Sequence, residues 1–250
     1  MNHNDSHKIS YEDRLSDFVE AAAHDLHAPL RKLSTMVERV FTQNAVHFDE
    51  SSTQYVGRIL SCIEEMKSLI DGLTELAKAA PGPIDTVNCD LNVVVNEVLG
   101  SLSEEIAEKH ARVMVSTLPT VTGNGVQYRQ LFKNLLENAI KFSRRDVVSQ
   151  ISIAEEPIDG DEVKSNELSS RQKYYKIVVR DNGIGFDQAY AEKIFEPFVR
   201  LHPKSQYDGN GLGLSICRKI VDNHNGIIYA RGTGNEGSLF VLILPQPPLP

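Results

Sequence analysis

Apolar residues recur at alternating steps of four and three along two segments near the N-terminus. The first series runs from residue 15 to residue 40 and the second from residue 56 to residue 80. Each series is long enough for several heptads, so we expect two long helices with a narrow apolar seam. The seam positions are Leu15, Val19, Ala22, Leu26, Pro29, Leu33, Met36 and Val40, followed by Val56, Ile59, Ile63, Met66, Ile70, Leu73, Ala77 and Ala80.

The polar segment 43–52 separates the two series and predicts a turn. Two helices with such a stripe cannot bury it alone. A symmetric dimer that forms a four-helix bundle would bury both stripes. The alternative is a hairpin within one chain whose stripe is covered by the second domain.

The pattern changes to mixed α/β after Pro81-Gly82-Pro83, which predicts the end of the second helix and a linker. Asn124 is a candidate N-cap for a helix that runs to about Phe142. The polar segment 155–173 predicts a flexible hairpin loop, and residues 1–10 and 246–250 predict unstructured tails. The other expected helices are 91–109 and 214–223, and the expected strands are 112–116, 148–154, 174–180, 227–231 and 238–244.

Composition narrows the class of protein. The 250 residues are 41% hydrophobic and 24% charged, as in a soluble globular protein. A net charge of −8 without a long basic run argues against nucleic acid as the main partner. No membrane-spanning stretch and no signal peptide is found, and the scattered Cys62, Cys89 and Cys217 are typical of buried, reduced thiols, so we expect a cytoplasmic location.

Three short segments carry candidate chemistry for a nucleotide. Asn134, Asn138 and Lys141 share one helix face, where amides and an ammonium could hold hydrated Mg²⁺ and its phosphates. In segment 181–185, a carboxylate at a strand end could bind an exocyclic amine such as that of adenine, and glycines let the backbone approach a flat ring. In segment 209–213, glycines open a helix whose amides could bind phosphate. Taken alone, each has an ordinary alternative as a solvated residue, a turn or a surface loop.

The polar segment 199–208 precedes the last of these and contains Arg200, His202 and Lys204. It suits a mobile lid whose cations reach a terminal phosphate, and a charged surface loop is the alternative.

These segments, with Phe195-Glu196-Pro197-Phe198, resemble the ATP-binding domain of the sensor histidine kinases of two-component signalling. That family carries an N box, a first glycine box, an F box and a second glycine box in this order, and the resemblance covers roughly residues 11–245. It implies bound ATP and Mg²⁺. The residues that it assigns to the nucleotide are Asn134, Asn138, Lys141, Asp181, Gly183, Gly185, Phe195, Phe198, Arg200, Gly209, Gly211, Gly213 and Leu214.

By the same resemblance, Asn138 ligates Mg²⁺, Asp181 binds the adenine amine and Arg200 approaches the γ-phosphate, while Phe195 and Phe198 anchor the lid. Gyrases, a heat-shock chaperone and mismatch-repair proteins share this ATP fold, so the fold alone does not establish a kinase.

Segment 18–31 resembles the H box of the same family, especially its phytochrome-like branch. The resemblance assigns His24 as phosphoacceptor and Asp25 as its acidic partner. The heptad positions place His24 on the outer helix face, and Pro29 cannot donate to the carbonyl of Asp25, so the helix should loosen there. His27 has no matching role in the family.

The resemblance implies a fold of two parts. Residues 11–80 form a helical hairpin in a dimeric four-helix bundle, residues 81–87 a linker, and residues 88–245 an α/β sandwich ATP-binding domain. The implied reaction is autophosphorylation of His24 and transfer to an aspartate of a response regulator receiver domain. Input comes from an upstream sensor domain or sensor partner.

Two rival functions remain at this point. One is a non-enzymatic phosphotransfer scaffold with a degenerate ATP domain, which the intact set of boxes disfavours. The other is an ATP-driven conformational machine of the gyrase class, which has no need of His24. Ala28 stands where many family members that also dephosphorylate their regulator carry Thr or Asn, so we expect weak phosphatase activity.

Overall fold

The computed structural model describes residues 3–44, 47–79, 87–158, 162, 168, 172–203, 206–207, 209–234 and 236–247. The chain divides into two compact units, residues 1–80 and 81–250. Residues 81–86, the greater part of the expected linker, lie outside the described residues. No helix within the described ranges is long and apolar enough to cross a membrane.

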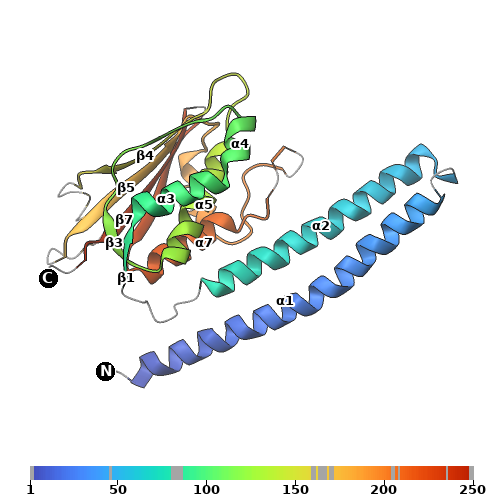
Figure 1. Ribbon diagram of the computed structural model, residues 1–250, viewed down its shortest axis with the longest axis horizontal. Helices are drawn as coiled ribbons and strands as arrows, with labels where there is room; N and C mark the ends of the chain where they lie inside the picture. Colours follow the sequence, from blue (N-terminus) through green and yellow to red (C-terminus); the bar gives the residue numbers. More distant parts are fainter. Residues whose placement is uncertain are drawn as a thin grey trace. The chain divides into compact units, whose positions relative to one another are not determined.

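The first unit is a hairpin of two long helices, α1 (His3–Asn44) and α2 (Glu50–Lys78) (Figure 1). The expected unstructured tail over residues 1–10 is wrong from His3 onward, since α1 begins there. Helix α2 starts after Asp49, whose carboxylate accepts a hydrogen bond from the backbone N–H of Ser52 at 2.7 Å. Such a cap satisfies one of the amides that the first helical turn leaves without a partner.

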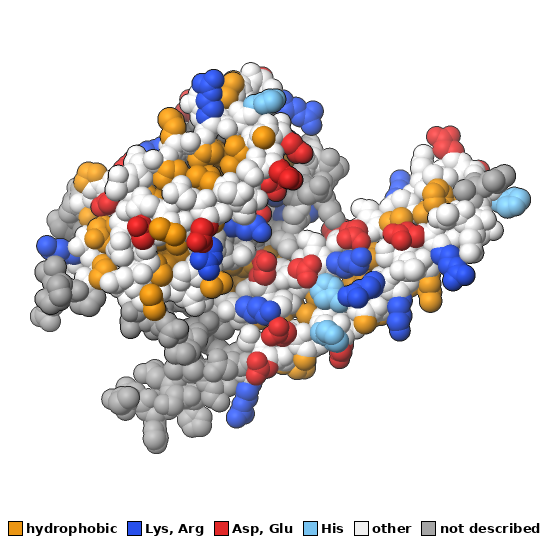
Figure 2. Space-filling model, viewed as in Figure 1, with side chains coloured by type: hydrophobic (Ala, Val, Ile, Leu, Met, Phe, Trp, Pro, Cys, Tyr) orange, Lys and Arg blue, Asp and Glu red, His pale blue; other side chains and the backbone are white. Residues whose placement is uncertain are grey.

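The contact between α1 and α2 buries little of the expected seam. The buried residues of the hairpin are Ala23, Leu30, Ile63, Gly72 and Ala79. Only Ile63 of these belongs to the seam, among the seam positions whose side chains the structure describes. Hydrophobic side chains are visible on the surface of the hairpin (Figure 2). The large apolar seam residues that stay exposed in the single hairpin are Leu26, Leu33, Met36, Val40, Ile59, Met66 and Leu73.

The second unit is a mixed α/β sandwich, as expected. Its helices are α3 (Leu91–Ser101), α4 (Ser103–Glu108), α5 (Gly125–Lys141) and α7 (Gly213–Asn223), with short 3₁₀ turns η2 (Gln188–Tyr190) and η3 (Lys193–Phe195). Its strands are β1 (Val87–Asp90), β2 (Arg112–Val115), β3 (Thr120–Gly123), β4 (Gln150–Glu156), β5 (Tyr174–Asp181), β6 (Ile227–Thr233) and β7 (Gly237–Pro245). The single helix expected over 91–109 is two helices, because α3 ends at Ser101 and α4 begins at Ser103.

Two sheets make up the strand layer. Strands β1 and β3, neither of which the sequence pattern predicted, form a small antiparallel pair. The other five strands run in the order β2-β4-β5-β7-β6, with β2 and β4 parallel and the remaining pairs antiparallel. Helices α3, α5 and α7 cover one face of this sheet (Figure 1). Because side chains alternate along a strand, the buried Ile177 and Val179 of β5 share one face and Val178 takes the other.

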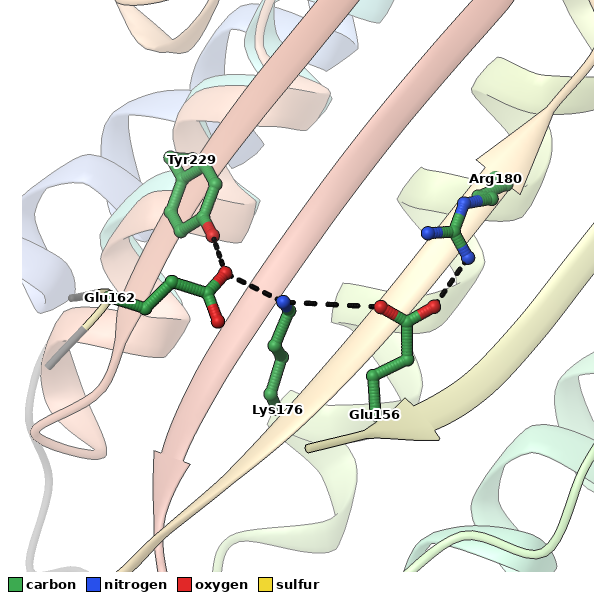
Figure 3. A network of polar contacts seen from close by, with 5 residues as sticks. All are labelled: Glu156, Glu162, Lys176, Arg180 and Tyr229. Atoms are coloured by element: carbon green, nitrogen blue, oxygen red, sulfur yellow. Dashed lines mark hydrogen bonds and ion pairs between the residues drawn. The ribbon is translucent and has the colours of Figure 1, made fainter. Parts of the chain in front are cut away.

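The second face of the sheet also carries packed side chains. Val178, Val241 and Ile243 form a buried cluster, against which Ile158 and Leu168 pack from the segment expected to be a flexible loop. Next to it lies a polar network (Figure 3), in which Glu162 of the same segment accepts from Lys176 Nζ at 2.6 Å and from Tyr229 Oη at 3.0 Å. Lys176 also faces Glu156, which pairs with Arg180. The described part of this segment is therefore packed on the sheet.

The three cysteines differ in burial. Cys217 is buried, as expected for a structural thiol, and its burial raises the pKa of the thiol. The expectation of buried thiols is wrong for Cys62, which is exposed on α2, and Cys89 is half-buried.

Candidate functional site

The imidazole of His24 projects from α1 into solvent. Its side chain is 86% exposed, and its Nδ1 lies 3.3 Å from Oδ1 of Asp25. Adjacent helical residues do not normally face each other, so this contact depends on the rotamers of both side chains. When Nδ1–H donates to Asp25, the neutral ring presents the lone pair of Nε2 to solvent. The ring is thus an accessible nitrogen nucleophile.

The turn that follows His24 has two unusual features. Helix α1 continues through Pro29, although proline supplies no N–H for the carbonyl of Asp25. Within this turn, Nε2 of His27 lies 3.0 Å from Oδ1 of Asp71 on α2. No sequence signal could have identified this pair, because its members lie on different helices.

Helix α5 begins at a well-formed cap. The side-chain oxygen of Asn124 accepts from the backbone N–H groups of Val126 and Gln127, which confirms the expected N-cap. The helix carries Asn134, Asn138 and Lys141, and the structure gives the two asparagines different surroundings.

Asn134 is a buried residue that joins two parts of the unit. Its side chain is 7% exposed, its Oδ1 accepts from Gln130 Nε2 at 3.1 Å, and its Nδ2 donates to the carbonyl oxygen of Gly213 at 3.1 Å. Both ends of the amide are therefore occupied by protein groups. This placement ties α5 to the first residue of α7.

Asn138 is half-buried, and its side-chain amide has no hydrogen-bond partner among the described residues. Its carbonyl oxygen fits the oxygen chemistry that Mg²⁺ requires. Lys141, one turn further along α5, has its Nζ 4.5 Å from the centroid of the Phe142 ring. A Cβ placed on Gly209 would lie 2.7 Å from that Nζ. The structure therefore brings the lysine of α5 against the start of the second glycine segment.

Asp181 ends strand β5 and is held by two backbone amides. Its Oδ1 accepts from the N–H of Gly183 at 2.8 Å and from the N–H of Ser238 at 3.2 Å. Burial raises the pKa of this carboxyl, and the two backbone hydrogen bonds oppose part of that rise. The side chain of Ser238 also hydrogen-bonds this carboxyl and lowers its pKa. A carboxylate has acceptor sites for more than these bonds, so Asp181 can also accept from a donor of a ligand. Sequence reasoning did not identify Ser238.

The loop after Asp181 packs on the end of α5. Ile184 N–H donates to the carbonyl oxygen of Phe142 at 3.0 Å, and a Cβ on Gly183 would lie 2.5 Å from that oxygen. Glycine is required by this close approach. Asn182 fixes the other side of the loop, accepting from Gln150 N–H at 2.8 Å and donating to the carbonyl of residue 148 at 2.9 Å. Gly185 in the same loop has a φ of 63°.

The two phenylalanines expected to anchor the lid are placed differently. Phe195 is buried, with the guanidinium carbon of Arg218 4.3 Å from its ring centroid. Phe198 is exposed, has a φ of 65°, and is held through its backbone, since its N–H donates to the carbonyl of Gly211 at 2.9 Å. A Cβ on Gly211 would lie 2.9 Å from the carbonyl oxygen of Val199. This backbone contact joins the F box to the second glycine segment.

The described part of segment 199–208, which the sequence predicted as a lid, lies against the end of α5. The ring of Tyr207 is 4.9 Å from that of Phe142 and the ring of His202 is 6.0 Å from it. Arg200 donates through Nη2 to the carbonyl of Tyr207 at 2.8 Å. Lys204 lies outside the described residues. Sequence reasoning did not predict the aromatic contacts, although Phe142 ends the expected helix.

Helix α7 begins at Gly213 directly after the second glycine segment. Its N-cap residue, Leu212, makes no side-chain cap hydrogen bond, although its own N–H donates to Oδ1 of Asn210 at 3.0 Å. The first-turn amides of such a helix can bind an anion. Gly213 and Leu214 stand in this first turn. The C-terminal half of α5 carries Asn138 and Lys141. The loop after Asp181 and the start of α7 both bond to this helix or its cap. The arrangement is suited to a purine nucleotide with its phosphates.

Comparisons with known proteins agree with these arrangements. The model of the "Histidine kinase-, DNA gyrase B-, and HSP90-like ATPase" family matches residues 123–248, and that of the "His Kinase A (phospho-acceptor) domain" matches residues 14–82. Cyanobacterial phytochrome A of Nostoc sp. is 32% identical over 92% of this chain and 28% of its own length. Phytochrome-like protein Cph1 of Synechocystis sp. is 32% identical over 92% of this chain and 29% of its own. The chain therefore spans less than a third of these relatives.

Solved structures show the same fold. The catalytic domain of histidine kinase ThkA matches with a TM-score of 0.52 at 26% identity, covering 66% of this chain and all of that domain, 100%. Full-length ShkA in complex with AMPPNP matches with a TM-score of 0.63 at 21% identity, covering 91% of this chain and 45% of that one. A phosphoacceptor domain followed by an ATPase domain defines one family, and this chain belongs to the sensor histidine kinases of two-component systems.

Proposed function

We propose that this chain is a catalytic core that phosphorylates its own His24 from ATP and passes the phosphoryl group to an aspartate of a response regulator. The observation that carries the proposal is the exposed imidazole of His24, paired through Nδ1 with Asp25, on a chain that also holds all four nucleotide boxes. A phosphotransfer scaffold has no need of the nucleotide boxes, and a gyrase-like machine has no need of the exposed His24.

In the proposed reaction, Nε2 of His24 attacks the γ-phosphorus of ATP. The N–P bond forms as the bond from phosphorus to the β,γ-bridging oxygen breaks, and ADP leaves. Positive charge builds on the ring, and Asp25 stabilises the proton on Nδ1. The protein accelerates such transfers mainly by positioning and by neutralising phosphate charge.

The nucleotide would be held by the residues around the end of α5. The carboxylate of Asp181 would accept from the adenine amine. Lys141 and the first-turn amides of α7 would bind the phosphates, and Arg200 would supply a further cation. Asn138 would hold Mg²⁺, because its side-chain amide makes no hydrogen bond among the described residues, whereas Asn134 donates to Gly213. When bound, the ion neutralises phosphate charge.

The functional unit in this proposal is a homodimer. The exposed apolar residues of α1 and α2, among them Leu26, Leu33, Met66 and Leu73, form a face that the single hairpin leaves in water. Packing two such faces gives the four-helix bundle expected from the heptads.

The remaining partners follow from the family. Histidine kinase ThkA has been solved in complex with the response regulator protein TrrA, and we propose an equivalent receiver domain for this chain. We further propose a cytoplasmic location and a sensor upstream or on a partner. Ala28 offers no side-chain hydrogen bond to orient a water, so dephosphorylation of the regulator should be weak, and Ala28→Asn should raise it.

The test is incubation of the full chain with γ-labelled ATP and Mg²⁺. We expect an acid-labile, alkali-stable label on the wild type and none on His24→Gln, with circular dichroism showing that the variant is folded. His47→Gln, which removes another exposed histidine, is the matched control and should retain the label. Equal labelling of His24→Gln and the wild type would refute the proposed acceptor.

A further inference from the structure

Two ion pairs between α1 and α2 bracket the proposed phosphoacceptor. Glu20 Oε1 lies 2.9 Å from Lys78 Nζ, and His27 Nε2 lies 3.0 Å from Asp71 Oδ1. Glu20 and His27 are seven residues apart on α1, and Asp71 and Lys78 are seven residues apart on α2. The two pairs therefore repeat after one heptad, and the two helices run in opposite directions. His24 stands four residues after the first pair on α1 and three before the second, on the same helix stripe.

These pairs do little for the stability of the fold. Exposed ion pairs contribute little because water already solvates both charges and long side chains lose freedom. Glu20, Lys78 and Asp71 are all well exposed, while the ring of His27 is 28% exposed. Their common effect is geometric, since each one fixes the rotation of α1 against α2 at its own level. That rotation sets the direction in which His24 points.

The second pair lies where α1 is weakest. Pro29 leaves the carbonyl of Asp25 without its helical donor, and helices bend most readily at such a position. His27 lies inside the turn from Asp25 to Pro29, and its bond to Asp71 attaches that turn to α2. The contact with Asp71 therefore restrains the turn in which Pro29 removes a backbone hydrogen bond.

We propose that His27 is a positioning residue which, through Asp71, holds the turn that carries His24 in the orientation needed for phosphoryl transfer. This inference rests on the proposed autophosphorylation of His24. Transfer requires the attacking nitrogen within about 3–3.5 Å of phosphorus, and a shift of about 1 Å can cost about a hundredfold in rate. A restraint too weak to matter for folding is thus strong enough to matter for the reaction.

His27 is not itself a second acceptor in this proposal. Its Nε2, the nitrogen directed away from its own backbone, already faces Asp71. The Nε2 of His24 has no hydrogen-bond partner among the described residues, and its side chain is 86% exposed. Label that persists at His27 in the His24→Gln variant would contradict this assignment.

The test measures initial autophosphorylation rates of the full chain at several ATP concentrations. His27→Ala and Asp71→Ala should each lower the rate at saturating ATP about tenfold, with the KM for ATP unchanged. The double variant should be no slower than either single variant, because both remove the same contact. His27→Gln, which keeps a donor for Asp71, should stay within about threefold of the wild type. Glu64→Gln, which breaks the exposed Lys67–Glu64 pair within α2, is the matched control and should keep the wild-type rate.

A second measurement does not depend on kinase activity. Amide hydrogen exchange over residues 22–30 should become several-fold faster in His27→Ala and Asp71→Ala and stay unchanged in Glu64→Gln, because only the first two release the turn. An unlabelled wild type would refute the proposed function, and the exchange experiment would still decide whether the turn is restrained. Unchanged exchange and unchanged rates in both alanine variants, or additive losses in the double variant, would overturn the proposal.

Discussion

The side-chain amide of Asn134 donates to the carbonyl oxygen of Gly213, 79 residues further along the chain, at 3.1 Å. This hydrogen bond joins the N box on α5 to the residue where α7 begins. The start of α7, which we propose to bind phosphate, is therefore positioned by the helix that carries Asn138 and Lys141. An asparagine expected at the nucleotide acts here as a support for the glycine segment.

Asn134→Ala should destabilise the second unit by about 1–3 kcal/mol, because it removes two hydrogen bonds of a buried amide. Urea unfolding followed by circular dichroism measures this. The matched control is Asn138→Ala on the same helix, which should change the free energy of unfolding by less than about 0.5 kcal/mol. Equal losses in the two variants would show that Asn134 has no special structural role.

Asn138→Ala should instead weaken ATP binding in the presence of Mg²⁺, by about tenfold. The reason is that its half-buried amide oxygen is the ligand type that Mg²⁺ accepts. A tenfold loss of affinity corresponds to about 1.4 kcal/mol of binding free energy. Calorimetric titration of the full chain with ATP, with and without Mg²⁺, measures the effect. A tenfold loss that persists when Mg²⁺ is chelated would assign Asn138 to the nucleotide and not to the ion.

Gly183→Ala should destabilise the second unit by about 1–3 kcal/mol and weaken ATP binding. The new Cβ would lie 2.5 Å from the backbone carbonyl oxygen of Phe142, so either the loop or the end of α5 must move. Gly100→Ala is the matched control, because nothing lies within 4 Å of its added Cβ. That change should be neutral or stabilising, since alanine has the higher helix propensity. Equal stability of the two variants would disprove the close approach at Gly183.

The periodic segments were predictable from the sequence because their burial is periodic. The two long helices α1 and α2 appear near their expected positions. So do helix α5 with its Asn124 cap and the strands of the five-stranded sheet. Strands β1 and β3 were not predicted, although β2, which also has four residues, was. Four residues give at most two alternations, so a strand of this length carries little periodic signal. The break between α3 and α4 at Leu102 was missed, although Gly100 lies two residues before it, because the apolar pattern continues to Ile106.

The sequence offers candidate residues for the site, but it does not offer their contacts. Motif order identified Asp181 and the glycines, whose backbone surroundings the structure shows. Two contacts, Asn134 with Gly213 and His27 with Asp71, join segments distant in sequence. Such pairing depends on tertiary packing, which periodicity does not encode. The same holds for the hairpin, where the expected seam is mostly exposed because the intrachain contact uses a neighbouring helix face.

The second unit should lose stability as the pH falls below about 6.5, in part through His224. This ring is buried, its Nε2 accepts from Asn124 N–H at 3.0 Å and its Nδ1 faces the carbonyl of Ile220 at 2.7 Å, an arrangement that requires the neutral ring. Burial lowers the pKa of His224. A histidine whose folded pKa is depressed contributes stability above the ordinary value of about 6.5, and that contribution is lost as the pH falls toward the folded pKa.

Urea unfolding at pH 5.5 and 7.5 measures this contribution in the wild type and in His224→Gln. The variant should be less stable at pH 7.5 and should show a smaller difference between the two pH values. His47→Gln, an exposed histidine, should keep the wild-type pH dependence. An unchanged pH dependence in His224→Gln would assign the acid sensitivity to other groups.

Leu33→Glu should convert the proposed homodimer into monomers. Leu33 is 48% exposed in the single hairpin and belongs to the apolar face that the intrachain contact leaves open. A carboxylate there would be buried without a partner at the centre of a four-helix bundle, at a cost of several kcal/mol. Lys32→Glu places the same charge on the adjacent exposed residue, outside the seam, and should remain dimeric. Sedimentation equilibrium of both variants and the wild type measures the mass, and a dimeric Leu33→Glu chain would contradict the proposed interface.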